Sequence, residues 1–149
     1  MKYFFGVFAL IFAVSMTHGQ SSATETSVPA YHKAAPAKGE KLPPILTEQQ
    51  LAQMGMTAPA QKAAYKAAAR ASSVVYQQPC YCYCDRHAGH KSLRSCFETT
   101  HGANCGTCMA EALYSYKMSR KGWSAKMIRD GIIRGEFKQI DLQNPEPVR

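Results

Sequence analysis

All six cysteines of this 149-residue chain lie between positions 80 and 108. Three alternate in "PCYCYCDRHAGH", at Cys80, Cys82 and Cys84, and Cys96 follows. Cys105 and Cys108 then form a Cys-x-x-Cys pair. Thiols this closely spaced are typical of metal sites, redox pairs or disulfide frameworks. The chemistry of sulfur therefore constrains the fold of this segment more than any other feature of the sequence.

Residues 1–19 have the pattern of a secretory signal peptide. Lys2 precedes the apolar run "YFFGVFALIFAVSM", which is short for a bilayer span. Gly19 supplies a small residue before a cleavage point at Gln20. An uncleaved membrane anchor is the alternative. We expect cleavage, a periplasmic or secreted protein, and no stable membrane span afterwards.

The formal net charge is +8, and removal of Lys2 with the signal leaves +7. Such a balance can attract nucleic acid, but export and the scattered positions of the charges argue against that partner. Lys62, Lys66 and Arg70 repeat at four-residue spacing and form one basic stripe on a helix. We interpret this stripe as a solvated helix face, with attraction to anionic lipids as the alternative.

The composition divides the rest of the chain into three parts. Residues 20–45 are rich in Ala, Ser, Pro and Lys and have few large apolar side chains, which is typical of a flexible tether. Residues 142–149 form a polar tail. The sequence predicts one helical, cysteine-rich domain over residues 46–141.

Helix start and stop signals follow one another along this domain. Thr47 and Gln50 form a capping-box pattern, with Gly55 as a stop. Because no alternating strand pattern is present, we expect a mostly α fold with an irregular cysteine-rich loop. A second helix is predicted to start at Thr57, with Pro59 in its first turn, and a third to run from Ser92 to Gly102. A fourth is predicted from Cys105 to Arg120, capped by Asn104. The last is predicted from Ser124 to Gly135, with Trp123 and Ile128 as a hydrophobic staple.

The spacing of the cysteines predicts two groups of sulfurs. In an extended segment, Cys80, Cys82 and Cys84 would share one face, and the intervening tyrosines would share the other. Cys105 and Cys108 would lie together at the start of a helix, where the helix dipole favours thiolate.

We hypothesise a soft-metal site, with copper(I) as the first ion and zinc as the second. Met109 and Met118 lie nearby, but Met109 falls on an apolar helix face and indicates core packing. The role would be metal binding, delivery or detoxification, with another exported metal-handling or redox protein as a possible partner. The predicted ligands are Cys80, Cys82, Cys84, Cys96, Cys105, Cys108, His90 and His101.

Two other interpretations stay open. A thiol–disulfide redox protein or redox sensor would use Cys105 as the attacking thiolate and Cys108 as the resolving thiol, although the strand–helix alternation of thioredoxins is missing. An exported module with three structural disulfides would also use an even number of cysteines. Paired carboxylates, a nucleophile–base set and a phosphate loop are not seen in the sequence, so we do not expect a hydrolytic enzyme.

The run "PCYCYCDRHAGHKSLRSCFETTHGANCGTCMAEA" resembles a family of small exported bacterial proteins. The family is named for its PCYCGC or CYCXC motif, and some members carry selenocysteine. The resemblance covers about residues 74–135, and the variable motif position falls on Tyr83, where other members can have Gly. Relatives of the lipoprotein type carry lipid on an N-terminal cysteine that this chain lacks, which implies a soluble form. The family has no settled activity, and selenium in relatives implies redox or soft-metal chemistry rather than inert cross-linking.

Overall fold

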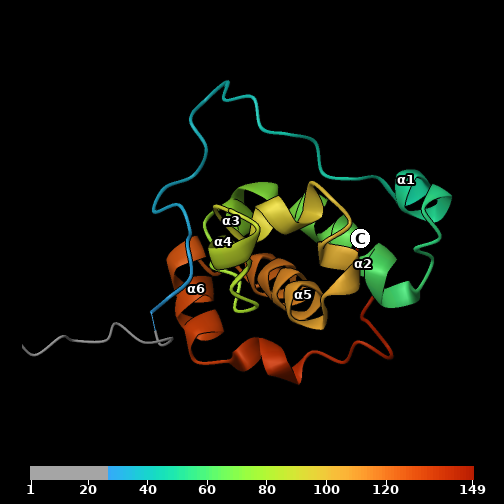
Figure 1. Ribbon diagram of the computed structural model, residues 1–149. Helices are drawn as coiled ribbons and strands as arrows, with labels where there is room; N and C mark the ends of the chain where they lie inside the picture. The colour runs from blue at the N-terminus through green and yellow to red at the C-terminus, as the bar shows by residue number, and fades with distance from the viewer. Residues whose placement is uncertain (1–26) are drawn as a thin grey trace, which may run out of the picture.

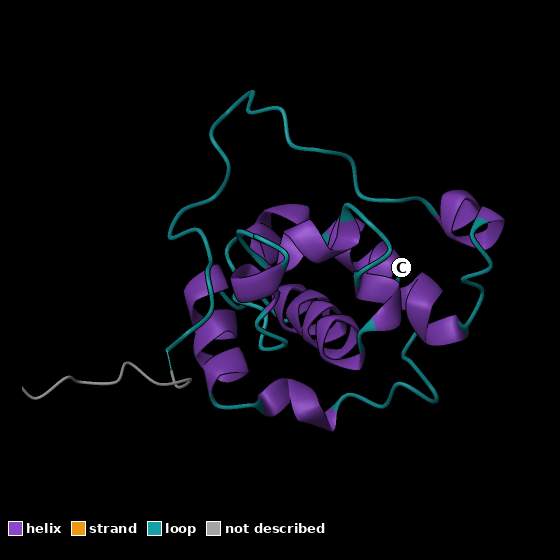
Figure 2. Ribbon diagram, viewed as in Figure 1, coloured by secondary structure: helices purple, strands orange, loops and turns teal. Residues whose placement is uncertain are grey.

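The structure is a computed structural model that describes residues 27–149. The predicted signal peptide and residues 20–26 of the predicted tether lie outside the described residues. The described part is mostly helical and contains no strand (Figure 2), which confirms the predicted fold class. None of its helices combines the length and the apolar character that crossing a membrane requires. The elements are α1 Glu48–Gln53, α2 Pro59–Arg70, α3 Ser72–Tyr76, α4 Cys84–His87, η1 Leu93–Phe97, η2 Gly102–Asn104, α5 Gly106–Arg120, α6 Ala125–Ile133 and η3 Glu136–Gln139, where η denotes a 3₁₀-helix.

Helix α5 lies at the centre of the fold (Figure 1). It contacts α2, α3, α6 and all three 3₁₀-helices, and α2 is its most extensive neighbour. Seven of its residues are buried, including Cys108, Glu111 and Tyr114. The cysteine-rich segment between α3 and η1 lies beside the N-terminal half of this helix (Figure 1). The central helix therefore carries one group of sulfurs and faces the other.

The sequence signals for α1 and α6 are confirmed. Thr47 caps α1 through a complete capping box with Gln50, and Gly55 follows it with a φ of +75°. Ser124 caps α6, where its side chain accepts a hydrogen bond from the amide of Met127. Trp123 packs with Ile128 in one apolar cluster, as the predicted staple requires.

Two predicted helix starts are wrong by one residue. The N-cap of α2 is Ala58 rather than Thr57, because the side chain of Gln61 accepts a hydrogen bond from the amide of Ala58 at 3.0 Å. The N-cap of α5 is Cys105 rather than Asn104. Cys105 has extended backbone angles, and its Sγ accepts a hydrogen bond from the amide of Cys108 at 3.4 Å.

Of the helix predicted from Ser92 to Gly102, only the 3₁₀-helix η1 forms; bends and turns follow over residues 98–101, and η2 begins at Gly102. Phe97 ends η1 fully buried, and its ring packs edge-on against Tyr65 with the centroids 4.9 Å apart. Gly102 starts η2 against this ring, where an added Cβ would lie 2.9 Å from Phe97 Cε1. Because Gly102 packs directly against the buried ring of Phe97, the chain turns after Phe97 and the predicted continuous helix does not form.

The buried side chains form two apolar clusters on opposite sides of α5. The larger cluster contains Leu51, Tyr65, Leu93 and Phe97 together with four of the cysteines. The smaller cluster is formed by Ala110, Tyr114, Ile128, Ile132 and Phe137. Because four thiols belong to the larger cluster, the sulfur site is part of the hydrophobic core rather than a loop on its surface.

Residues 27–45 form no helix or strand, yet several of them contact the helical part. The ring of His32 stacks on Tyr76 with the centroids 3.8 Å apart, and the guanidinium of Arg129 lies 4.5 Å from the centroid of the Tyr31 ring. At the other end of the chain, Val148 is buried. The predicted boundaries at residues 45 and 141 stay predictions, but contacts extend across both.

Candidate metal centre

The cysteine triplet is a turn followed by a helix, so the predicted extended segment is wrong. The amide of Tyr83 donates a hydrogen bond to the carbonyl of Cys80 at 3.0 Å, and α4 begins at Cys84. Tyr83 has a φ of 57°, in the left-handed region that costs a residue with a Cβ about 1–2 kcal/mol. This conformation reverses the chain and turns the three sulfurs inward.

The sulfurs of both predicted groups meet in one buried cluster. Cys80 Sγ lies 3.3 Å from Cys108 Sγ and 3.4 Å from Cys82 Sγ. Cys82 Sγ lies 3.6 Å from Cys108 Sγ, and Cys84 Sγ lies 3.4 Å from Cys96 Sγ. Cys80, Cys84, Cys96 and Cys108 are at most 2% exposed, whereas Cys82 and Cys105 are half-buried. The cluster thus has a buried interior and one partly open side.

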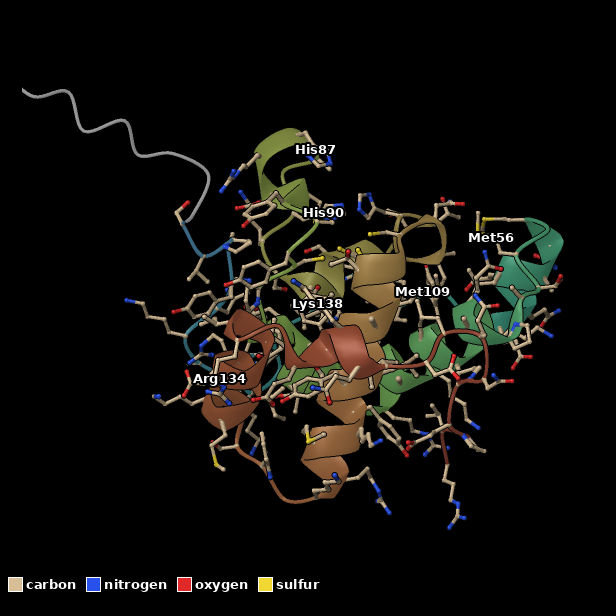
Figure 3. The ribbon with its side chains drawn as sticks, turned by 90° about the horizontal axis from the view of Figure 1, so that it is seen from below. Met56, His87, His90, Met109, Arg134 and Lys138 are labelled. Atoms are coloured by element: carbon tan, nitrogen blue, oxygen red, sulfur yellow. The ribbon has the colours of Figure 1, made fainter. Side chains whose placement is uncertain are left out.

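Two histidines complete the cluster. His90 Nδ1 lies 3.2 Å from Cys96 Sγ, and His101 Nε2 lies 3.6 Å from Cys82 Sγ. Their rings meet edge-on with the centroids 4.8 Å apart. His87 is exposed, and its ring centroid lies 6.3 Å from that of His101. Figure 3 shows His87 and His90 near each other on the α4 loop, at the edge of the molecule.

All eight residues that the sequence predicted as ligands are brought together. Their donor atoms fall into four overlapping groups, within each of which all the atoms lie within 4.8 Å of one another. Such groups can hold a metal ion. Whether these residues do so stays a prediction, because the arrangement shows proximity rather than binding. The groups are Cys82, His101, Cys105 and Cys108; Cys84, His90, Cys96 and His101; Cys80, Cys82 and Cys84; and Cys80, Cys96 and Cys108.

Met109 is partly buried and packs against the larger apolar cluster, as its position on an apolar helix face predicted. Met118 packs against the smaller cluster on the other side of α5. Both thioethers thus contribute to the core, in agreement with the interpretation from the sequence.

The sequence predicted thiolate at Cys105 and Cys108, at the start of the central helix, but the pKa values of the thiols follow a different order. Hydrogen bonds from Cys105, Cys108 and Cys80 lower the pKa of Cys82, because they stabilise its thiolate. The hydrogen bond with Cys105 raises the pKa of Cys108, which keeps its proton. Hydrogen bonding with Cys108 likewise lowers the pKa of Cys96, whereas the pKa of Cys105 is raised. The thiolate is therefore favoured at Cys82 and Cys96 rather than at the predicted Cys105 and Cys108.

Sequence reasoning missed Glu111, which is fully buried beside the cluster. Its Oε1 accepts a hydrogen bond from the amide of Tyr81 at 2.9 Å. Among the described residues, its Oε2 has no hydrogen-bond partner. Burial raises the pKa of Glu111 to about 8, and the hydrogen bond from Tyr81 only partly offsets this. The signal in the sequence was an acidic residue in the apolar run "CMAEALY", three positions after Cys108.

A buried arginine stabilises the surroundings of the cluster. Arg94 forms an ion pair with Glu98, four residues later. The guanidinium also donates hydrogen bonds to Ser72 Oγ at 3.0 Å and to the carbonyl of Pro43 at 2.7 Å. Arg94 thereby links η1, which carries Cys96, to α3 and to the segment before α1.

All six cysteines are free thiols in the structure. Their closest Sγ–Sγ distance is 3.3 Å, longer than the bonded distance of about 2.05 Å. The sulfurs are in contact without being bonded. The arrangement therefore suits a shared ligand, and it also places several pairs close enough to be oxidised.

The chain was compared with protein families, curated proteins and solved structures. Neither a curated protein nor a solved structure matches it. The match to a family covers residues 9–145 and includes the whole cysteine cluster. The family motif has Gly where this chain has Tyr83, the residue with the left-handed backbone that glycine adopts without cost. The chain belongs to the family described as protein of unknown function with PCYCGC motif.

Proposed function

We propose that this protein is an exported binder of a soft metal ion, held by Cys82, Cys105, Cys108 and His101. The observation that carries the proposal is that these three sulfurs and one imidazole nitrogen lie within 4.8 Å of one another. Three thiolates and one imidazole are a common ligand set for a tetrahedral zinc site, and thiolates also select copper(I). We take copper(I) as the first ion because six sulfurs lie in one cluster, with zinc second.

The position of this group favours handling of an ion over a purely structural role. Cys82, Cys105 and His101 are half-buried, whereas Cys108 is buried. A partner could therefore reach the ion from the half-buried side of the group, while Cys108 binds the ion from the core side. Binding for delivery or detoxification, with another exported metal-handling or redox protein as the partner, fits this arrangement.

Metal analysis of the purified protein, together with a free-thiol count, tests the proposal. We expect stoichiometric copper or zinc after anaerobic loading with copper(I) or zinc in separate experiments. A competing chelator of known affinity then ranks the two ions. Cys105→Ser should lower the affinity by at least tenfold, because it removes a half-buried ligand without opening a core cavity. His87→Ala is the matched control, since His87 belongs to no donor group. Protein that retains neither ion would overturn the proposal.

Thiol–disulfide exchange is the second candidate, and the lowered pKa of Cys82 favours it. The Cys82 thiolate would attack a substrate disulfide, form a mixed disulfide and release one substrate thiolate. Cys108, 3.6 Å away, would then lose its proton and attack Cys82. That step releases the second substrate thiol and leaves a Cys82–Cys108 disulfide, so two electrons pass to the substrate. Reduction of a disulfide peptide by the metal-free protein, abolished by Cys82→Ser, would support this candidate; no reduction would remove it.

A further inference from the structure

The donor atoms are too numerous for one ion. Six sulfurs and two imidazoles form the cluster, whereas a tetrahedral ion takes four ligands and copper(I) no more. The two groups of four donors have only His101 in common. If His101 binds the first ion with Cys82, Cys105 and Cys108, the other three donors of the second group remain available for another ion. These are Cys84, His90 and Cys96.

These three donors form a compact set. Cys84 Sγ lies 3.4 Å from Cys96 Sγ, which in turn lies 3.2 Å from His90 Nδ1. Cys84 and Cys96 are at most 1% exposed. Pro29 and Ala30 of the N-terminal segment, together with Cys80, Cys84 and His90, line a small space beside the set. Two of its three donors are therefore buried, against one of the four in the first group, and His90 is half-buried.

Cys80 connects the two sets. Its Sγ belongs to one donor group with Cys82 and Cys84 and to another with Cys96 and Cys108. It is 2% exposed and lies 3.3 Å from Cys108 Sγ. A thiolate sulfur has enough lone pairs to bind two ions at once. Cys80 is thus the cysteine that belongs to neither set, and its sulfur lies within 4.8 Å of sulfurs from both.

We propose that the cluster holds two soft metal ions, the second bound by Cys84, Cys96 and His90, with the Cys80 thiolate bridging it to the first. This inference rests on the metal-binding function proposed above. Among the described residues, the sulfurs of Cys80, Cys84 and Cys96 contact other sulfurs and an imidazole and no cationic side chain. Thiolates that form in this core when metal binds would need a positive charge beside them, and two ions would supply it to both sets.

The test is the ratio of metal to protein in the full chain after anaerobic loading with copper(I), measured in parallel with zinc. We expect two ions in the unmodified protein and one in His90→Ala and Cys96→Ser. His87→Ala should keep two. Because Cys96 is buried and its variant can misfold, the half-buried His90 provides the primary variant, and circular dichroism checks its helix content.

The bridge has its own measurement. X-ray absorption of the loaded protein should show a metal–metal scattering path, and Cys80→Ser should remove it. If the unmodified protein and His90→Ala both bind one ion, the second metal position is wrong and the proposed function stands. A ratio of zero would overturn both. A ratio above two would also overturn the two-ion assignment, as would two ions with no metal–metal path.

Discussion

The carboxyl group of Glu111 accepts a hydrogen bond from the backbone amide of Tyr81 at 2.9 Å, which attaches the turn between Cys80 and Cys82 to the central helix. Thirty positions separate the two residues in the sequence. The bond fixes the turn whose sulfurs contact Cys108, one helical turn before Glu111 on α5. Because Glu111 is fully buried, its protonation is coupled to the stability of the whole fold.

Glu111 should make the stability of the metal-free, reduced protein depend on pH. Burial raises its pKa from 4.5 to about 8, so the folded state holds a proton that the unfolded state releases. Stability from this source is complete below about pH 4.5 and is lost as the pH rises to about 8. At 1.36 kcal/mol for each pH unit between 4.5 and about 8, the loss is about 5 kcal/mol.

Urea unfolding at pH 5 and at pH 8 measures this dependence. The Glu111→Gln variant should lose less stability between the two pH values than the unmodified protein, because glutamine keeps an oxygen for the Tyr81 amide and does not ionise. The thiols titrate in both proteins, so the difference between the two proteins isolates Glu111. Equal losses would contradict the assignment.

Tyr83 should be replaceable by glycine at little cost. Its φ of 57° strains a residue with a Cβ, and its ring contributes a contact with Arg86, whose guanidinium carbon lies 4.1 Å from the ring centroid. Tyr83→Gly relieves the strain and loses the ring, whereas Tyr83→Ala loses the ring and keeps the strain. Thermal unfolding should show the glycine variant more stable than the alanine variant by about 1 kcal/mol. The reverse order would mean that the turn does not have this backbone in solution.

Gly102→Ala should destabilise the protein and weaken metal binding together. The new Cβ would lie 2.9 Å from Phe97 Cε1 and 3.0 Å from the carbonyl oxygen of Cys96. Relief of this overlap displaces the ends of the segment that carries Cys96 and His101. We expect a loss of about 1–3 kcal/mol in chemical denaturation, typical of overpacking.

Gly106→Ala is the matched control for that substitution. Gly106 is the first residue of α5, and the nearest atom to an added Cβ is Leu142 Cδ1 at 3.8 Å, an ordinary contact. Alanine favours a helix over glycine, so stability and metal affinity should be unchanged or slightly raised. Equal losses in both variants would rule out the overlap at Phe97 as the cause.

Mild oxidation of the metal-free protein should join Cys84 to Cys96. Their sulfurs lie 3.4 Å apart, and neither sulfur has a closer sulfur neighbour among the described residues. The sulfur of Cys80, by contrast, contacts those of both Cys82 and Cys108, so these two thiols compete to form a disulfide with it. Peptide mapping by mass spectrometry without reductant should find the Cys84–Cys96 bridge first. Loading with metal before oxidation should prevent this bridge, because the ion holds both thiols. A different first bridge would contradict the prediction from the sulfur distances.

The sequence predicted the helical class and most helix ends because caps and glycine stops act within a few residues. The capping box of Thr47 and the Ser124 cap are local hydrogen bonds, and they form as predicted. The error at Asn104 also has a local cause: its side chain donates to the carbonyl of Thr100, four residues earlier, at 3.0 Å, and Cys105 caps α5 instead. The predicted ligands also follow from residue type and spacing, and the fold brings all eight into one cluster.

What the sequence by itself determined is therefore the inventory of sulfurs and imidazoles and the central helix that carries two of them. Only the tertiary structure decided which sulfurs touch, because contacts such as Cys80 with Cys108 span 28 positions and depend on how the larger core cluster packs. The left-handed turn at Tyr83 and the break between η1 and η2 replaced shapes that local patterns favoured. Burial of Glu111 likewise depends on neighbours from distant segments, so its raised pKa became visible only once those segments were in place.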